Sequence, residues 1–233
     1  MGILVHSNGM PGLSFSVPGA MFTYALGIDN RGSVIGRWSS PSQDIFVRSP
    51  NGTLSYLALP SGVTVLTEAA ISENGRIVVS ANDSMYFLDG QTYAAVAVPG
   101  AGGAGNAVNV GGINNSGDVV GYYYTNSGTS PSFFRDLKGA FETIDVPGSA
   151  YTNVMGLNDL GQAVGFYYDG AQFHGFLWIA GTITPLDYPG AAGTFANGIN
   201  DAGEIVGYYN DASGNAHGFL ASPTSSYGRR GHP

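Results

Sequence analysis

Five stretches of the chain repeat one pattern: GIDNRGSVIGRW from Gly27, AISENGRIVVSA from Ala70, GINNSGDVVGYY from Gly112, GLNDLGQAVGFY from Gly156 and GINDAGEIVGYY from Gly198. Each copy ends a tight turn on a glycine, and these are Gly32, Gly75, Gly117, Gly161 and Gly203. The period is therefore 42 to 44 residues. A period of this length with strand-like content predicts a stacked or radial array of small units.

The fourth copy shows what one unit contains. Asn158–Gly161 reads as a turn, because Asn and Asp bond their own backbone and Gly accepts positive φ. Short apolar runs bounded by turn residues follow at 163–167, 174–178 and 184–188, and a first strand precedes the turn. No stretch has helical periodicity. Strands joined by two to six residues pair antiparallel, so each repeat is expected to be a four-stranded antiparallel sheet.

The second strands are apolar on both faces, so each sheet must be covered on both sides by neighbouring sheets. Four-stranded units repeated in a ring predict an all-β fold, a five-bladed β-propeller. The fifth repeat ends after Gly218-Phe219-Leu220 without a fourth strand, whereas Ser14–Gly19 resembles Thr143–Gly148. We therefore expect the N-terminal strand to close the ring in the last blade. One domain is expected over 13–222, with repeats at about 21–60, 64–99, 106–147, 150–189 and 192–222 plus 13–19, and flexible ends at 1–12 and 223–233.

Composition narrows the functional classes. The net charge of −8 argues against nucleic-acid binding, which needs a basic surface. No apolar run approaches the roughly 18 residues of a membrane span, and the first residues do not read as a signal peptide. The absence of Cys excludes disulfides and thiolate chemistry. We expect no cofactor and no metal, because the matched His174 and His217 lie in different blades, and we expect a monomer.

The pattern GIN-x-x-G-x-x-V-G-x-Y, followed by H-G-F-L and D-x-P-G, resembles the HAF-type extracellular repeat family of bacteria. The best copies are repeats four and five, with His174–Leu177, Asp187–Gly190 and His217–Leu220. The resemblance covers about Leu13 to Leu220, and repeat two departs most, with Val79 in place of the mid-strand glycine. It implies an exported protein, extracellular or periplasmic, and no defined activity.

Candidate ligand-binding residues come from positions where the repeats differ. The loops after the second strands lie on the face of the Pro-Gly crossovers between blades. Aromatic rings beside amides and carboxylates suit a sugar, whose C–H groups pack on rings while its hydroxyls bond polar groups. A glycan or small polar ligand is therefore expected at this crossover face. The candidate residues are Arg37, Trp38, Tyr124, Asn126, Tyr168 and Asp169. The alternative is that these aromatic rings only fill space between blades.

Glu68 is the candidate catalytic residue. Counted back from the turn glycines, it stands among Ala25, Val110, Val154 and Ala196. A carboxyl surrounded by apolar groups should have a raised pKa, which suits a general acid. A binding or interaction module is the favoured function. A saccharide hydrolase or lyase using Glu68 and a structural surface protein remain open alternatives.

Overall fold

The structure is a computed structural model that describes residues 2–4, 13–40, 42–57, 63, 66–81, 83–89, 92–101 and 107–223. Throughout these residues the chain is β-structure with turns and loops, as the sequence predicts. No helix in the described part of the chain is long and apolar enough to cross a membrane. The expected flexible ends lie largely outside the described residues.

The repeats fold as successive antiparallel units, numbered here in chain order. Unit 1 contains β3 (Phe22–Ile28), β4 (Val34–Ser40), β5 (Ser42–Arg48) and β6 (Leu54–Leu57). Unit 2 contains β7 (Leu66–Ile71), β8 (Ile77–Ala81), β9 (Ser84–Asp89) and β10 (Thr92–Ala97). Unit 3 contains β11 (Val108–Ile113), β12 (Val119–Tyr123), β13 (Ser132–Arg135) and β14 (Phe141–Ile144). Unit 4 contains β15 (Tyr151–Leu157), β16 (Gln162–Tyr168), β17 (Phe173–Ile179) and β18 (Thr182–Leu186). Unit 5 contains β19 (Gly193–Ile199), β20 (Ile205–Asn210) and β21 (Ala216–Ala221). The predicted four-stranded antiparallel arrangement is thus confirmed for units 1 to 4, and unit 5 has three strands, joined to unit 4 by one parallel pair, Phe173 with Gly193.

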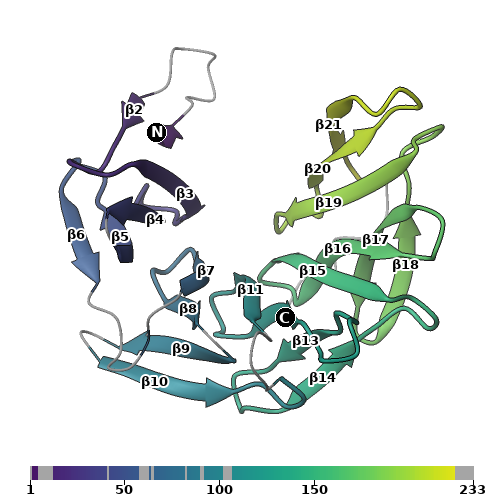
Figure 1. Cartoon of the computed structure of the whole chain (residues 1–233), viewed down its shortest axis with the longest axis horizontal. Coiled ribbons are helices and arrows are strands. Elements are labelled where there is room, and N and C mark those ends of the chain that lie inside the picture. The colour runs from purple at the N-terminus through teal and green to yellow at the C-terminus, as the bar shows by residue number, and fades with distance from the viewer. Residues whose placement is uncertain are drawn as a thin grey trace, which may run out of the picture.

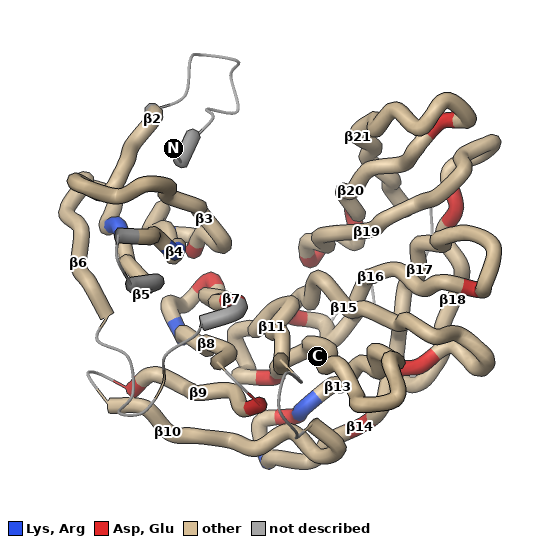
Figure 2. Tube along the Cα trace, in the orientation of Figure 1, with Lys and Arg blue, Asp and Glu red and all other residues tan. Residues whose placement is uncertain are grey.

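The units stand side by side in an arc, with the first strand of each toward the centre and the fourth strand outside (Figure 1). Basic residues are few and spread along the chain rather than gathered on one surface (Figure 2). The apolar core lies between units. One cluster joins Ile35 of unit 1 to Val79 of unit 2, and another joins Val120 of unit 3 to Phe176 of unit 4. Because both faces of units 2 to 4 are covered, strands with apolar residues on both sides are stable there.

Closure of the ring differs from the expectation. Strand β2 (Leu13–Phe15) pairs with β1 (Gly2–Leu4), and β21 is the last strand of its sheet. The expected pairing of Ser14–Val17 with β21 is therefore not formed among the described residues, and the arc is open between units 1 and 5 (Figure 1). Ring closure through the N-terminal strand stays a proposal.

Candidate functional site

A belt of cross-strand pairs follows the units at the crossover end. Each pair joins one residue near the start of a first strand to one near the end of the second strand. The pairs are Tyr24 with Arg37, Glu68 with Ser80, Asn109 with Tyr122, Asn153 with Phe166, and Phe195 with Tyr208. We call these ten residues the crossover belt. Its members in units 1 to 3 are largely polar or charged, whereas those from Phe166 onward are aromatic.

The aromatic half of the belt is continuous across units. The Phe166 and Phe195 rings, from neighbouring units, have centroids 5.0 Å apart and meet edge to face. Phe195 in turn stacks on Tyr208 at 4.6 Å with an interplanar angle of 11°. Phe195 is buried within this stack and Phe166 is half-buried, so Tyr208 is the ring that this part of the belt exposes. Units 1 to 3 contribute charged and hydrogen-bonding groups to the belt.

Glu68 enters this belt because of a displaced β-bulge. In the other four units the bulge in the first strand follows the residue that pairs with a mid-strand glycine, as at Val154 opposite Gly165. A Cβ on Gly165 would lie 2.1 Å from the Asn153 carbonyl oxygen, so this bulge requires glycine. Unit 2 has Val79 at that position, and its bulge instead lies between Leu66 and Glu68.

The displaced bulge corrects the expected environment of Glu68. Ala69 pairs with Val79 and takes the place that Ala25, Val110, Val154 and Ala196 have in the other units. Glu68 pairs with Ser80, one position further along. Counting back from the turn glycine therefore misplaces the counterpart of Ala25, Val110, Val154 and Ala196 by one residue in this unit. The structural counterparts of Glu68 are belt residues, not the small apolar residues that the sequence suggests.

The expected rise in the pKa of Glu68 is nevertheless confirmed. Partial burial raises the pKa of the Glu68 carboxyl, and the positive charge of Arg37 partly offsets that rise. Glu68 also influences Tyr122 in the next unit. Burial, the Tyr124 and Glu68 charges, and a hydrogen bond with the Tyr124 side chain together raise the pKa of Tyr122 to about 12. Charged and phenolic groups from three units are thus coupled at one end of the arc.

Two of the six predicted ligand-binding residues join this coupled group. The Arg37 guanidinium lies 5.4 Å from the centre of the Tyr24 ring, which favours a cation–π contact. Tyr124 meets Tyr122 edge to face, with ring centroids 5.8 Å apart, and is exposed. Sequence reasoning missed Tyr122 as a site residue, although it lies only two residues before Tyr124, near the end of β12.

The structure does not bring Trp38 to this group. Successive residues of a strand point to opposite faces, so Trp38 lies on the other side of β4 from Arg37. Its indole ring packs on Tyr56, with centroids 5.6 Å apart. Asn126 is an exposed residue of the loop after Tyr124.

Tyr168 is the last residue of β16, and Asp169 begins the corresponding loop of unit 4. The Tyr168 hydroxyl donates to the Gly170 carbonyl at 2.9 Å. The Asp169 carboxylate accepts the backbone N–H groups of Ala171 and Gln172, at 2.7 and 2.8 Å. These N–H groups, with His174, lower the pKa of Asp169 to about 2. Both side chains therefore have structural partners within their own loop.

The two repeat histidines bind carboxylates of their own units. His174 Nδ1 lies 2.9 Å from Asp187 Oδ2, its Nε2 lies 3.1 Å from Asp169 Oδ2, and its ring stacks on Tyr167 at 5.0 Å. His217 lies 2.9 Å from Asp211 Oδ2 and stacks on Tyr209 at 5.2 Å. Among the described residues, neither histidine belongs to a group that could hold a metal.

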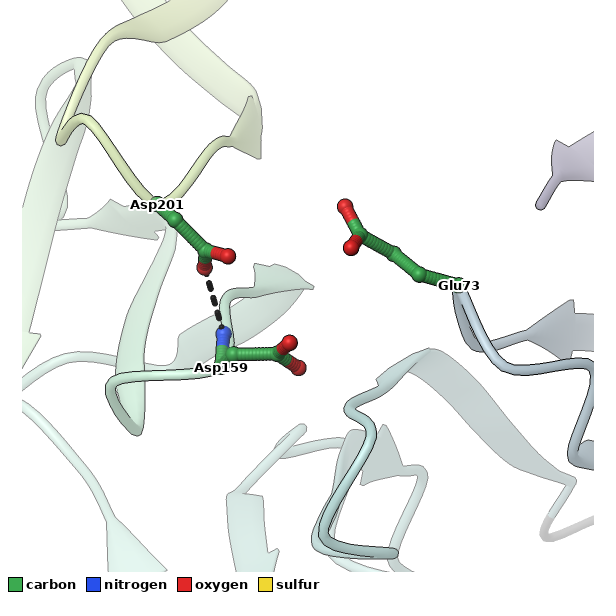
Figure 3. A group of neighbouring side chains, drawn as sticks. All are labelled: Glu73, Asp159 and Asp201. Carbon is green, nitrogen blue, oxygen red and sulfur yellow. Dashed lines mark hydrogen bonds between the residues drawn. The ribbon is translucent and has the colours of Figure 1, made fainter. Parts of the chain in front are cut away.

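The opposite end of the units carries a chain of bonds between turns. The Asn115 N–H donates to Asp159 Oδ1 at 2.7 Å, and the Asp159 N–H donates to Asp201 Oδ1 at 2.8 Å. Figure 3 shows that Glu73 reaches toward this pair. One carboxylate oxygen from each of Glu73, Asp159 and Asp201 lies within 4.8 Å of the others, a spacing that could hold a metal ion. Glu73 and Asp201 are exposed and Asp159 is half-buried. The hydrogen bonds of Asp159 and Asp201 explain the cluster as a link between units.

Comparison with known proteins assigns the fold. No family model matches the chain, and no curated protein matches it. Virginiamycin B lyase from Staphylococcus aureus is 16% identical, with a TM-score of 0.51 over 85% of this chain and 73% of that chain. TolB from Acinetobacter baumannii is 11% identical, with a TM-score of 0.61 over 94% and 58%. Aleuria aurantia lectin is 12% identical, with a TM-score of 0.52 over 87% and 74%. The chain therefore shares a β-propeller fold with lyases and lectins, and the comparisons assign it to no family.

Proposed function

We propose that this chain is an exported binding module that recognises a glycan or another small polar molecule at the crossover belt. The observation that carries the proposal is the coupled group of Arg37, Glu68, Tyr122 and Tyr124. It supplies a cation, a carboxyl group and two phenols at one end of the arc. Export rests on the resemblance of the repeats to the HAF-type family.

The two halves of the belt suit the two kinds of surface on a sugar. Planar polar groups exchange hydrogen bonds with ring hydroxyls, and aromatic faces cover the C–H groups. Each ring contact contributes about 0.5–1.5 kcal/mol beyond area burial. The lectin that shares the fold is a binding protein, which supports this class of function by analogy only.

A glycan array followed by calorimetric titration of the best hit tests the proposal. Glu68→Gln and Tyr122→Phe should each weaken binding several-fold, because the first replaces the carboxyl with a neutral amide, the second removes a hydroxyl, and both preserve the size of the side chain. Leu160→Ala is the matched control, since Leu160 is exposed in a turn at the opposite end. A ligand that binds all three variants as it binds the wild type would show that the belt is not the site.

Trp38→Ala distinguishes the belt from the other side of β4. Loss of affinity in Trp38→Ala, with full affinity in Glu68→Gln, would move the site to the Trp38 and Tyr56 surface. The absence of any ligand after a wide screen would favour the structural surface protein instead.

A saccharide hydrolase or lyase is the second candidate, and one observation favours it. A carboxyl with a raised pKa keeps its proton closer to neutral pH and can act as a general acid. In that case Glu68→Gln should abolish turnover of the bound saccharide and leave its affinity largely unchanged. Unchanged turnover in Glu68→Gln would exclude this role for Glu68.

A further inference from the structure

The third strands of units 3 and 4 begin at equivalent positions with different residues. His174 in unit 4 pairs with Tyr167 of the second strand, and the register of β17 with β18 puts it opposite Asp187. In unit 3 the register of β12, β13 and β14 puts Pro131 at the same place, between Tyr123 and Asp145. Unit 3 therefore has the aspartate and the tyrosine that flank His174 in unit 4, but it has a proline in place of the histidine.

Unit 4 shows what the retained groups do when a base is present. The imidazole of His174 stacks on Tyr167 with an interplanar angle of 22° and bonds Asp187 through Nδ1. A second carboxylate, Asp169, bonds Nε2. A flat nitrogenous base between an aromatic ring and a carboxylate is thus a stable arrangement in this fold.

Among the described residues, no base bonds Asp145 in this way. Proline has no side-chain donor, and Thr125 stands in unit 3 where Asp169 stands in unit 4. The hydrogen bond found at the Asp145 carboxylate comes from the Ser132 N–H, 3.2 Å from Oδ1. Partial burial raises the pKa of Asp145, against the lowering effect of that N–H, and the Asp145 charge contributes to the raised pKa of Tyr123.

A cavity of about 270 Å³ lies beside this carboxylate, between the start of β13 and the crossover to unit 4. Its lining includes Thr129, Ser130, Asp145, Val146 and Ser149. Two smaller side chains here replace larger ones of unit 4. Ser130 stands where Phe173 packs on Phe195, and Val146 stands where Tyr188 stacks on Tyr209. The space follows from these replacements.

The hydroxyls around the cavity are already engaged with each other or with the chain. Ser130 Oγ donates to Asn153 Oδ1 at 2.7 Å, and Ser149 Oγ lies 2.7 Å from Thr152 Oγ1. The cavity can therefore mainly accept hydrogen bonds from a ligand. Asp145 is the one carboxylate among the lining residues. An acceptor-lined cavity with a negative charge favours a cationic donor.

We propose that the cavity beside Asp145 binds a small flat nitrogenous cation, of the guanidinium or imidazolium class, that donates hydrogen bonds to the Asp145 carboxylate from the cavity side. The site is separate from the coupled group around Glu68, and the inference does not depend on the proposed glycan site. Val146, Ser149 and the chain around Pro131 would line one side of the bound ligand.

Methylguanidinium is the probe, and N-methylurea is its uncharged counterpart of similar shape. Titration is followed by amide chemical shifts of Ser130, Ser132 and Ser149 in a two-dimensional NMR spectrum. We expect saturable shifts with methylguanidinium and at least tenfold weaker binding of N-methylurea. Asp145→Asn should weaken methylguanidinium binding at least fivefold. Asp187→Asn is the matched control and should leave these shifts unchanged.

Pro131→His supplies the missing base within the chain. It should pair with Asp145, occupy the site and abolish the methylguanidinium shifts while the other amide resonances keep their positions. Equal affinity in the wild type and Asp145→Asn, or equal affinity for the cation and the urea, would overturn the proposal. Saturable binding of methyl glycosides at these amides, with none of the cation, would overturn it too and assign the cavity to neutral polyols.

Discussion

Deletion of residues 1–19 tests whether the arc closes in solution through its N-terminal strand. The segment that follows β2 has the local structure of the crossovers that follow β14 and β18. The Ala20 N–H donates to the Val17 carbonyl at 3.1 Å, as Ser149 does to Val146 and Ala191 to Tyr188. The Val17 N–H also donates to the Thr23 hydroxyl, as Tyr188 does to Thr194. Residues 13–17 thus precede a crossover, as a fourth strand does.

The open flank of the arc exposes side chains that are buried elsewhere. Val206 is 51% exposed, whereas its counterparts Val78, Val120 and Val164 are 0% exposed. Ile28 and Leu220, also at this flank, are 56% and 64% exposed. Fully burying a large apolar side chain stabilises by about 1.5–3 kcal/mol. Closure that buries about half of the surface of each of these three side chains therefore stabilises the ring by roughly 3 kcal/mol.

Calorimetric melting and size-exclusion chromatography measure the effect. A loss of roughly 3 kcal/mol lowers the Tm of a chain of this size by about 6–12 °C, and the uncovered β21 edge should promote aggregation. Deletion of residues 1–12 is the control, because it removes β1 and keeps residues 13–19. A protein lacking 1–19 that stays monomeric with the wild-type Tm would refute closure by this strand.

Three further predictions concern single residues. Because the pKa of Glu68 is raised by folding, the folded state holds this proton more tightly, so stability falls as pH rises from the unfolded pKa through the folded one. Glu68→Gln should remove this loss, and urea melts from pH 4 to 7 would show an unaltered slope if the reasoning is wrong. Burial lowers the pKa of His174, but hydrogen bonds to Asp187 and Asp169 outweigh burial, so the pKa is raised. The stability that protonated His174 contributes is therefore full below the unfolded pKa and is lost as pH rises through the folded pKa. In His174→Gln the melting curves from pH 6 to 8.5 should lose that dependence, and an NMR titration placing the His174 pKa below that of an unfolded chain would contradict the assignment. Gly165→Ala should cost about 3 kcal/mol, because the new Cβ meets the Asn153 carbonyl; a denaturation midpoint equal to wild type would show that the bulge does not need glycine.

Much of the fold follows from local sequence. The turn at Asn158 forms because its side chain accepts the N–H groups of Leu160 and Gln162, and Gly161 has a φ of 72°. These are short-range effects, so the repeat pattern predicts them and the strands they connect. The matched histidines likewise remain in separate units, as their spacing predicts.

The composition of the site could not be predicted in the same way. The place of Glu68 depends on whether a Cβ on the neighbouring strand meets a carbonyl. This is a contact between two strands, in which Ala69 pairs with Val79 and Glu68 with Ser80. The coupling of Glu68 to Tyr122 crosses from unit 2 to unit 3. Neither relation leaves a periodic signal, so inspection of the repeats found Glu68 and Tyr124 but missed Tyr122.

The displaced bulge of unit 2 has an evolutionary consequence. Exchange of one glycine for a residue with a Cβ changes which amino acid a repeat presents to its neighbours, with no insertion or deletion. Duplicated repeats can therefore diverge in surface chemistry while their lengths stay in register, and a gap-free alignment of the copies assigns the divergent residue to the wrong column. The same exchange gives a designer of such arrays a way to rotate one side chain into or out of a shared surface by altering its partner strand alone.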